Sequence, residues 1–207
     1  KYFYLSDSDV TINGGSGTDY FYITNVNAFT DGTVLNGGSA TDYLYIQLPT
    51  GSTFDLTGKS YSGIEVLAIS TTNGAVRIDQ GNLVGVTSLQ GNTGARFITD
   101  EANLDLTGKS VSTVRIASDN PDGTTFTVNN INTAMQIDGG PGQDTLVTTF
   151  ALTAPQREAI FATSSIDVIR DTTGFYGSEG NNEISGTAGS DVIHGNGGND
   201  VLEGLAG

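Results

Sequence analysis

The sequence predicts an all-β fold, a parallel β-solenoid with one short helix. Short alternating apolar segments are separated by Asn, Gly, Asp and Ser, as in strands joined by turns. A nine-residue pattern recurs near the end of the chain, which is typical of stacked repeats. The 207 residues include 29 glycines, 4 prolines and 36% hydrophobic residues. This composition suits a narrow core rather than a thick globular one.

Charge and cysteine content exclude several classes of protein. The net charge is −15, from 23 acidic and 8 basic residues, which argues against nucleic-acid binding and suits hard cations such as calcium. The chain has no cysteine, so disulfides cannot hold the fold. No run of 18 apolar residues is present, and we expect no membrane insertion. Because Lys1 follows no signal peptide and the last repeat is cut short, we expect a fragment of a longer protein.

Repeats define the two ends of the chain. Three units of the pattern G-G-x-G-x-D-x-U-x, where U is a large apolar residue, follow one another over Gly177–Ser185, Gly186–His194 and Gly195–Glu203, and a fourth begins at Gly204. Single copies occur upstream, at Gly14–Tyr22, Gly37–Tyr45 and Gly139–Val147. In the second of these copies Ala40 replaces a glycine.

These units resemble the calcium-binding nonapeptides of RTX (hemolysin-type) proteins. Between them, Phe54–Ser60 and Leu104–Ser110 share Asp-Leu-Thr-Gly-Lys-Ser, and each leads into an alternating strand, Gly63–Ile69 or Ser112–Ala117. This second pattern is similar to the irregular coils of RTX adhesins and RTX surface-layer proteins. The resemblance implies a β-roll with calcium-binding turns, secretion by the type I route, and a place outside the cell at its surface.

The first six residues of each unit form a turn, whose glycines let carbonyl oxygens face inward beside the aspartate at position six. Calcium takes about six to eight oxygens, more than one turn supplies, so two turns one coil apart would share an ion. The resemblance implies Ca²⁺ ligands in all these turns: Gly15, Gly17, Asp19, Gly38, Ala40, Asp42, Gly140, Gly142, Asp144, Ser178, Gly180, Asn182, Asp191, Asn196, Gly198 and Asp200.

In the RTX family a regular coil holds two nonapeptides, so turns 18 residues apart stack. This pairs turn 177–182 with turn 195–200, although Asn182 replaces the family aspartate. The turn of Asp191 would need the truncated turn at Gly204. Asp19 and Asp42 can stack if residues 24–35 bulge from the coil, and they are the best-supported pair. Asp144 has no partner at regular spacing, so its turn is either a terminal site or an ordinary turn.

The sequence divides into four segments: RTX-like coils over 1–50, an irregular solenoid over 51–150, a helix-containing insertion over 151–176, and a truncated RTX roll over 177–207. Further strands are expected at Ala75–Ile78, Leu83–Thr87, Arg96–Thr99, Thr125–Val128 and Met135–Ile137. The helix is expected over Ala154–Thr163, capped by Thr153 with Gln156 and with Pro155 in its first turn. From Asp171 onward there are six acids and no Lys or Arg, so this block should need calcium to fold.

Three strands carry an aromatic pattern: Tyr2–Tyr4, Tyr20–Tyr22 and Tyr43–Tyr45. Alternation places Phe3, Phe21 and Leu44 inward and the tyrosines on the opposite face. Two interpretations stay open. The tyrosines stabilise neighbouring strands, or their exposed strip binds a cell-surface glycan or another copy of the chain.

No catalytic site is predicted. His194 is the one histidine and lies at the last strand position of a repeat, where a solvent-facing role is expected. Asp7 and Asp9 fit a degenerate turn. The predicted function is a structural or adhesive calcium-binding segment of a secreted surface protein, because the Asp-Leu-Thr-Gly coils favour it. The alternatives are the calcium-folded module of an enzyme whose catalytic domain lies elsewhere, and a β-helical carbohydrate enzyme.

Overall fold

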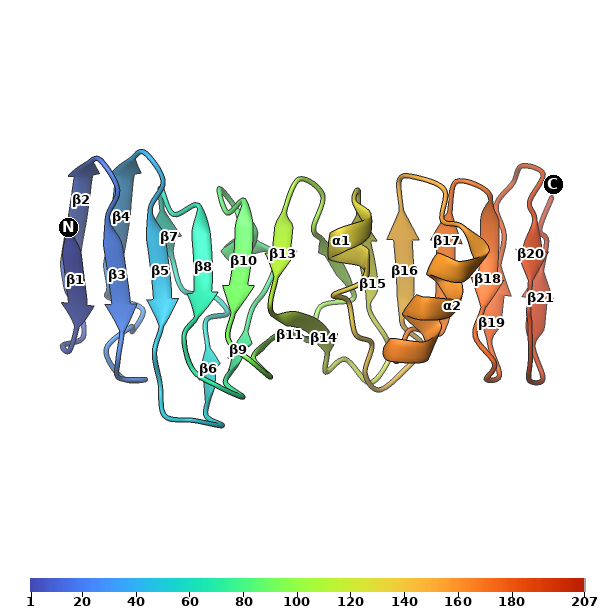
Figure 1. The fold of residues 1–207 in the computed structure, drawn as a ribbon, viewed down its shortest axis with the longest axis horizontal. Helices are drawn as coiled ribbons and strands as arrows, with labels where there is room; N and C mark the ends of the chain where they lie inside the picture. The colour runs from blue at the N-terminus through green and yellow to red at the C-terminus, as the bar shows by residue number, and fades with distance from the viewer. Residues whose placement is uncertain (207) are drawn as a thin grey trace. The chain divides into compact units, whose positions relative to one another are not determined.

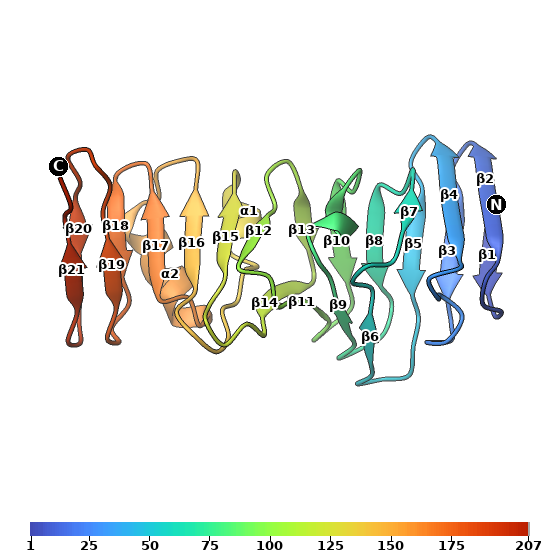
Figure 2. The ribbon, with the colours of Figure 1, turned by 180° about the vertical axis from the view of Figure 1, so that it is seen from behind.

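The computed structural model describes residues 1–206 and divides the chain into two compact units. Unit 1 comprises Lys1–Thr99 and Lys109–Ile116, and unit 2 comprises Asp100–Gly108 and the residues from Ala117 onward. Within each unit, short strands lie side by side as the rungs of a β-solenoid (Figures 1 and 2). Almost all strand pairs are parallel, which confirms the predicted fold class.

Unit 1 contains three sheets. The first consists of β1 (Tyr2–Leu5), β3 (Tyr20–Ile23), β5 (Tyr43–Ile46), β8 (Val66–Ile69), β10 (Ser88–Gly91) and β13 (Ser110–Ser112). The second consists of β2 (Thr11–Ser16), β4 (Val34–Ser39) and β7 (Tyr61–Ser62). The third contains β6 (Thr53–Asp55), β9 (Ala75–Arg77), β11 (Arg96–Thr99) and β14 (Arg115–Ser118), the strand at which the chain passes from unit 1 to unit 2.

The core of unit 1 is a column of apolar side chains, one from each coil. Strand register aligns Phe21, Leu44, Leu67 and Leu89, and all four are fully buried. Burial of each such side chain contributes about 1.5–3 kcal/mol. Alternation turns the neighbouring residues of each strand to the other face. Phe21 and Leu44 therefore point inward and their flanking tyrosines outward, as predicted.

Unit 2 contains two sheets. The larger consists of β12 (Asn103–Asp105), β15 (Thr125–Val128), β16 (Thr145–Thr148), β17 (Val168–Asp171), β18 (Gly174–Gly177) and β20 (Ile193–His194). The smaller pairs β19 (Glu183–Ser185) with β21 (Val201–Glu203). Its core column is Leu104, Phe126, Leu146 and Ile169, each fully buried. The β17–β18 pair is antiparallel, a hairpin that the prediction of parallel rungs did not include.

The predicted helix is confirmed as α2 (Ala154–Thr163). Thr153 and Gln156 form the expected capping box, and Pro155 lies in the first turn. The helix lies beside β17 and β18 (Figure 1) because its Arg157 forms an ion pair with the buried Asp171 at 2.7 Å and stacks over the Tyr176 ring. The helix therefore packs against the solenoid through this charged contact and through its buried Ile160.

Three local predictions were wrong. The strand expected at Leu83–Thr87 is preceded by a 3₁₀ turn, η1 (Gly81–Leu83), and pairing begins only at β10. The strand expected at Met135–Ile137 follows a second helix, α1 (Ile131–Ala134), because the Asn130 side chain caps its N-terminus by accepting from Thr133 N.

The strand expected at Ser112–Ala117 is divided into β13 and β14. The break falls at Thr113, which has a φ of 58° and forms a corner of the coil. The apolar pattern runs through this corner because Val111, Val114 and Ile116 are all buried. Hydrophobic alternation therefore did not reveal it.

Candidate metal centre

The two N-terminal repeat turns, 14–19 and 37–42, stack as predicted. Strands β2 and β4 pair in parallel through the turns themselves, with Gly15 opposite Gly38 and Ser16 opposite Ser39. Gly17 N donates to Ser39 O at 3.1 Å. The extra residues of this coil form the loop between β3 and β4, which lets two turns 23 residues apart lie in register.

Glycine at the first turn position lets a carboxylate approach the backbone. A Cβ on Gly14 would clash with Asp19 Oδ2 and with the Gly37 carbonyl oxygen. The second glycines, Gly15 and Gly38, have φ values of 103° and 105°, a region that other residues rarely adopt. The Gly15 carbonyl oxygen is directed at Gly38 of the next coil. The turns thus bring backbone and carboxylate oxygens close together.

Carboxylates link successive coils in a repeated arrangement. Asp42 Oδ1 accepts a hydrogen bond from Asp19 N at 2.7 Å, and Glu65 Oε2 accepts one from Asp42 N at 2.8 Å. The N-terminal ammonium nitrogen of Lys1 lies 3.0 Å from Asp19 Oδ1, in the position that the backbone N–H of Asp19 has relative to Asp42. We call Asp19, Asp42 and Glu65 the unit 1 column. Sequence reasoning missed Glu65 because it follows no glycine-rich repeat, although it lies 23 residues after Asp42.

Two oxygens of this column have no donor. Asp19 and Asp42 are 1% and 0% exposed, and Oδ2 of each lacks a hydrogen-bond partner. Such a buried charged atom is strongly unfavourable unless a proton or a cation compensates it. Burial raises the pKa of Asp42, and the nearby charges of Asp19 and Glu65 raise it further. The N-terminal ammonium already lies beside the other oxygen of Asp19, so the need for protonation or a bound cation is greatest at Asp42.

The surroundings of these oxygens fit calcium. The available ligands are carboxylate and backbone carbonyl oxygens, which hard cations prefer. Over residues 1–206, no three His, Cys, Asp or Glu side chains cluster as a metal site. A site at Asp19 and Asp42 would thus combine carboxylates with carbonyls of the stacked turns. The roles expected for the Gly15, Gly17, Gly38 and Ala40 carbonyls stay predictions.

A second column, in unit 2, uses the same links but satisfies its carboxylate with protein donors. Thr124 N donates to Asp144 Oδ1 at 2.8 Å, and Asp144 N donates to Asp167 Oδ2 at 2.8 Å. Asp144 was expected to have no partner at the regular spacing of 18 residues, and the residue that it contacts in the next coil, Asp167, lies 23 residues on. Gly140 N also donates to Asp144 Oδ2 at 2.7 Å. Both oxygens of the fully buried Asp144 therefore have partners.

The turn of Asp144 also stacks on a turn that sequence reasoning missed. A Cβ on Gly140 would clash with the Ser118 carbonyl oxygen, and one on Gly142 would clash with Gly123 N. The missed turn runs through Asn120-Pro-Asp-Gly, where Asn120 Nδ2 donates to Gly123 O at 2.7 Å. Its Pro-Asp-Gly sequence is a turn signal that could have revealed it.

The terminal repeats stack at the predicted spacing of 18 residues. Asn182 N donates to Asp200 Oδ1 at 2.9 Å, and β19 pairs with β21 in register. Asn182 is buried, and its Nδ2 donates to Ser178 Oγ at 3.2 Å. The Gly180 carbonyl oxygen is directed at Gly198. The neutral amide thus takes the place that aspartate has in unit 1.

Two other predicted ligands of this block already have hydrogen-bond partners within the protein. Asp191 accepts from Thr187 N at 2.6 Å and from Thr187 Oγ1 at 3.0 Å, both within its own turn. Asn196, with a φ of 62°, donates through Nδ2 to Gly177 O at 2.6 Å. Their ligand roles stay predictions, and so does that of Ser178.

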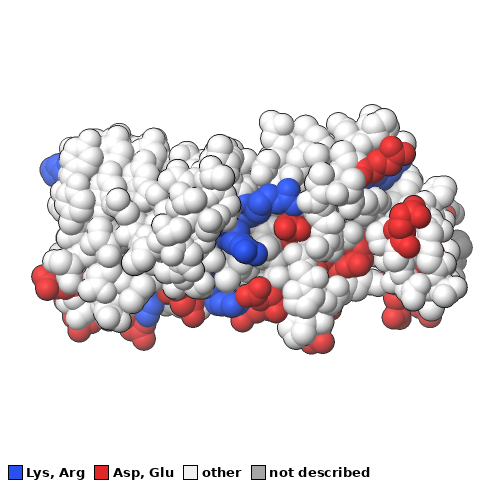
Figure 3. Space-filling model, turned by 60° about the horizontal axis from the view of Figure 1, so that its bottom comes forward, with Lys and Arg blue, Asp and Glu red and all other residues white. Residues whose placement is uncertain are grey.

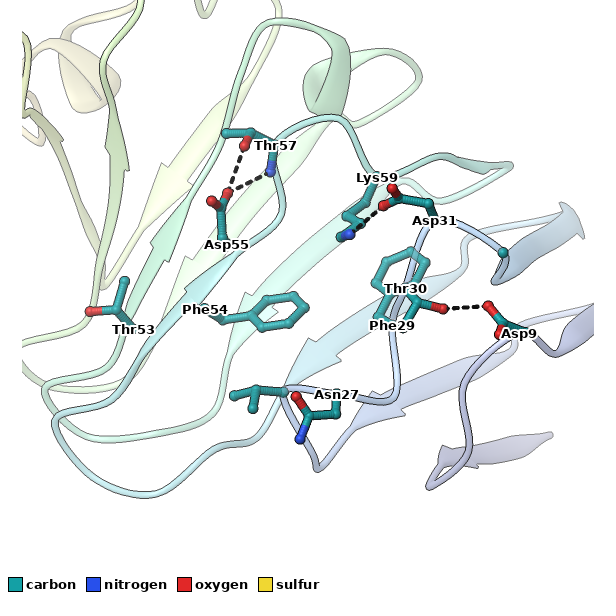
Figure 4. A pocket seen from close by; sticks show the side chains of 12 residues that line it. Asp9, Asn27, Phe29, Thr30, Asp31, Thr53, Phe54, Asp55, Thr57 and Lys59 are labelled. Carbon is teal, nitrogen blue, oxygen red and sulfur yellow. Dashed lines mark hydrogen bonds and ion pairs between the residues drawn. The ribbon is translucent and has the colours of Figure 1, made fainter.

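A separate acidic hollow of about 660 Å³ in unit 1 lies beside the loop between β3 and β4 (Figure 4). Its acids already have protein partners. Asp9 accepts from Thr30 Oγ1 at 2.7 Å, and Asp31 pairs with Lys59 Nζ at 2.5 Å. Asp55 accepts from Thr57 N at 3.0 Å. These acids are exposed, and none of them has a buried oxygen without a partner like those of the unit 1 column.

On the face drawn in Figure 3, acidic side chains are more widespread than basic ones, in line with the net charge of −15. None of the helices within residues 1–206 is long and apolar enough to span a membrane.

A comparison with known protein families identifies some of these turns as repeats of one family. A family model, the RTX calcium-binding nonapeptide repeat, matches residues 3–22 and 176–207. The match includes Asp19, Asp191 and Asp200 but not the turns of Asp42 and Asp144. No curated protein and no solved structure matches the chain significantly. The chain thus contains RTX calcium-binding nonapeptide repeats at residues 3–22 and 176–207, within a β-solenoid fold.

Proposed function

We propose that this chain is a calcium-folded structural segment of a secreted cell-surface protein, of the surface-layer or adhesin kind, without a catalytic site of its own. The observation that carries the proposal is the pair of buried oxygens without donors, Asp19 Oδ2 and Asp42 Oδ2. RTX repeats bind calcium and occur in secreted proteins. Calcium outside the cell would neutralise these carboxylates and stabilise the stacked coils, while low calcium inside would leave them unfolded for export.

The Asp-Leu-Thr-Gly coils support a structural role. Their two copies fold alike: Thr57 N donates to Asp55 Oδ1, and Thr107 N donates to Asp105 Oδ1. The leucine of each copy is fully buried in the core. In both copies the glycine N–H donates to a side chain of the following coil, at Asp79 or Asn129. The motif is therefore a way of turning and stacking a coil without a metal.

The tyrosine strip, defined as Tyr2, Tyr4, Tyr20, Tyr22, Tyr43 and Tyr45, supports the same role. Its rings stack on one another from coil to coil, with centroids 4.9–5.0 Å apart. Tyr20 and Tyr22 have a ring stacked on each side, so their faces cannot stack on a sugar and their edges and hydroxyls form the outer surface. Stabilisation of neighbouring coils is the role that we propose for the strip.

The proposal is tested by titrating the purified chain with calcium after chelation. Far-ultraviolet circular dichroism, thermal melting and light scattering would be followed together. We expect calcium to increase β-structure and the melting temperature, and light scattering shows whether copies assemble. An identical spectrum and melting temperature in chelator and in millimolar calcium would rule out a calcium-folded module.

Two quadruple variants at Tyr20, Tyr22, Tyr43 and Tyr45 test the strip. Phenylalanine keeps the stacked rings and removes the hydroxyls, whereas serine removes the rings. If stacking is the role, the serine variant melts earlier and the phenylalanine variant does not. Loss of calcium-dependent scattering in the phenylalanine variant would instead show that the hydroxyl edges bind another copy.

A further inference from the structure

We propose that a second calcium ion binds in unit 1, between the turn that ends at Asp42 and the segment that ends at Glu65. The inference deepens the proposed calcium function and rests on it. Glu65 belongs to no glycine-rich repeat and lies outside the residues that match the family model. Its place in the coil, rather than its sequence, identifies it.

Glu65 has the same position in its coil as Asp42 has in the preceding one. Strand register places Val66 opposite Tyr43, and Glu65 N donates to Asp42 O at 3.1 Å. Glu65 Oε2 accepts from Asp42 N at 2.8 Å, as Asp42 Oδ1 accepts from Asp19 N. The column of carboxylates therefore continues one coil beyond the last repeat turn of this region.

The first space lies between the coils of Asp19 and Asp42, and the second lies between the coils of Asp42 and Glu65. Each space contains a carboxylate oxygen without a donor. In the first space, Asp19 Oδ2 and the Gly37 carbonyl oxygen both face the open side of Gly14. In the second space, Asp42 Oδ2 and the Gly63 carbonyl oxygen face the open side of Gly37 in the same way. Because Asp42 is fully buried and its Oδ2 has no partner, the second space needs a cation at least as much as the first does.

The two spaces differ in the length of the segment that closes them. Six residues separate Asn36 from Tyr43, but only three separate the aligned Ser62 from Val66. Glutamate is one methylene longer than aspartate, and its carboxylate reaches back across this shorter segment. Fewer backbone carbonyls are available there, so we expect the second ion to bind more weakly than the first.

Substitutions along the column, each made in the 207-residue chain, distinguish one ion from two. Calcium chloride would be titrated into chelator-treated protein, with affinities from calorimetry and ion counts from native mass spectrometry. We expect Asp19→Asn and Glu65→Gln each to lose one ion relative to wild type. Asp42→Asn should lose two because Asp42 faces both spaces.

Glu158→Gln, on an exposed position of α2, is the matched control for loss of one charge and should keep every ion. Glutamine at position 65 can still accept from Asp42 N, so Glu65→Gln should melt as wild type in chelator. An unchanged ion count in Glu65→Gln, with one ion lost in Asp19→Asn, would overturn the second site and leave the proposed function standing. Absence of calcium binding in wild type would overturn both.

Discussion

The unit 1 column and the Asp144–Asp167 column of unit 2 have the same hydrogen bonds to the backbone. They differ in whether their carboxylate oxygens require a cation. Both contain a buried aspartate that accepts from a backbone N–H one coil earlier. In unit 2 the second oxygen accepts from Gly140 N, whereas in unit 1 Asp19 and Asp42 keep an oxygen without a donor. The same repeat sequence therefore forms a self-sufficient turn in one place and a cation-requiring turn in the other.

The difference comes from the second glycine of the turn. Gly15 and Gly38 belong to paired strands, so their backbone groups are directed toward neighbouring coils. Gly140 lies outside any strand, and its N–H is free to turn toward its own aspartate. A match to the repeat sequence alone is thus insufficient to assign a metal ligand. The partners of both carboxylate oxygens must be known.

The largest expected effect separates the two columns by substitution. Asp144→Ala leaves the N–H groups of Thr124 and Gly140 without an acceptor, which should cost about 4 kcal/mol for one buried and one partly buried hydrogen bond to a charged group. This loss should be equal in calcium and in chelator. Urea unfolding of the variant in both conditions measures it. A cost that appears only in calcium would show that Asp144 is a ligand.

Asp42→Ala is the counterpart in unit 1. At a calcium concentration 100 times the dissociation constant, binding stabilises the fold by about 2.7 kcal/mol. The variant should lose this calcium-dependent part of its free energy of unfolding. In chelator the change should be smaller, because the loss of the acceptor for Asp19 N is offset by the removal of a buried carboxylate oxygen that has no partner. Equal losses in the two conditions would contradict a calcium role for Asp42.

The next effect is the pH dependence of the calcium-free protein. Burial raises the pKa of Asp42, so the folded state binds this proton more tightly than the unfolded chain does. The resulting stabilisation is complete below the unfolded value of about 3.9 and is lost as the pH rises through the raised folded pKa. Wild type should therefore gain stability relative to Asp42→Asn as the pH falls through this range.

The same experiment repeated in calcium is a stricter test of Asp42, because protons and calcium compete for its carboxylate. Burial also raises the pKa of Asp144, but calcium should leave the pH dependence that comes from Asp144 unchanged. Urea midpoints across the pH range, for wild type, Asp42→Asn and Asp144→Asn, provide the comparison. A gap between wild type and Asp42→Asn that does not vary with pH would exclude this titration.

The smallest effect concerns Ala40, which occupies the fourth turn position with a φ of 92°. An L-residue is strained there, and Ala40→Gly should stabilise the chain by about 1 kcal/mol. Ala68, buried in β8, is the control, since glycine there removes packing and should destabilise. Thermal melting distinguishes the two. A lower melting temperature for Ala40→Gly would mean that the methyl group, and not the strain, dominates at this position.

The repeats and alternation predicted the solenoid class, the inward column and the stacks of Asp19 on Asp42 and of turn 177–182 on turn 195–200. The helix at Ala154–Thr163 was also predictable, since its capping residues act locally. Glu65 and Asp167 were not, because coil lengths vary from 18 to 23 residues and only the fold aligns them. Whether a carboxylate has donors depends on backbone directions one coil away, which a linear pattern does not encode.

The most direct test of the account is amide hydrogen exchange of the wild-type chain with and without calcium, read at residue resolution. Calcium should slow exchange in the turns around Asp19 and Asp42, where carboxylate oxygens lack donors. The turn at Gly139–Asp144, whose aspartate is already satisfied, should exchange at the same rate in both conditions. Equal protection of all three turns by calcium, or protection of the Asp144 turn alone, would contradict the account.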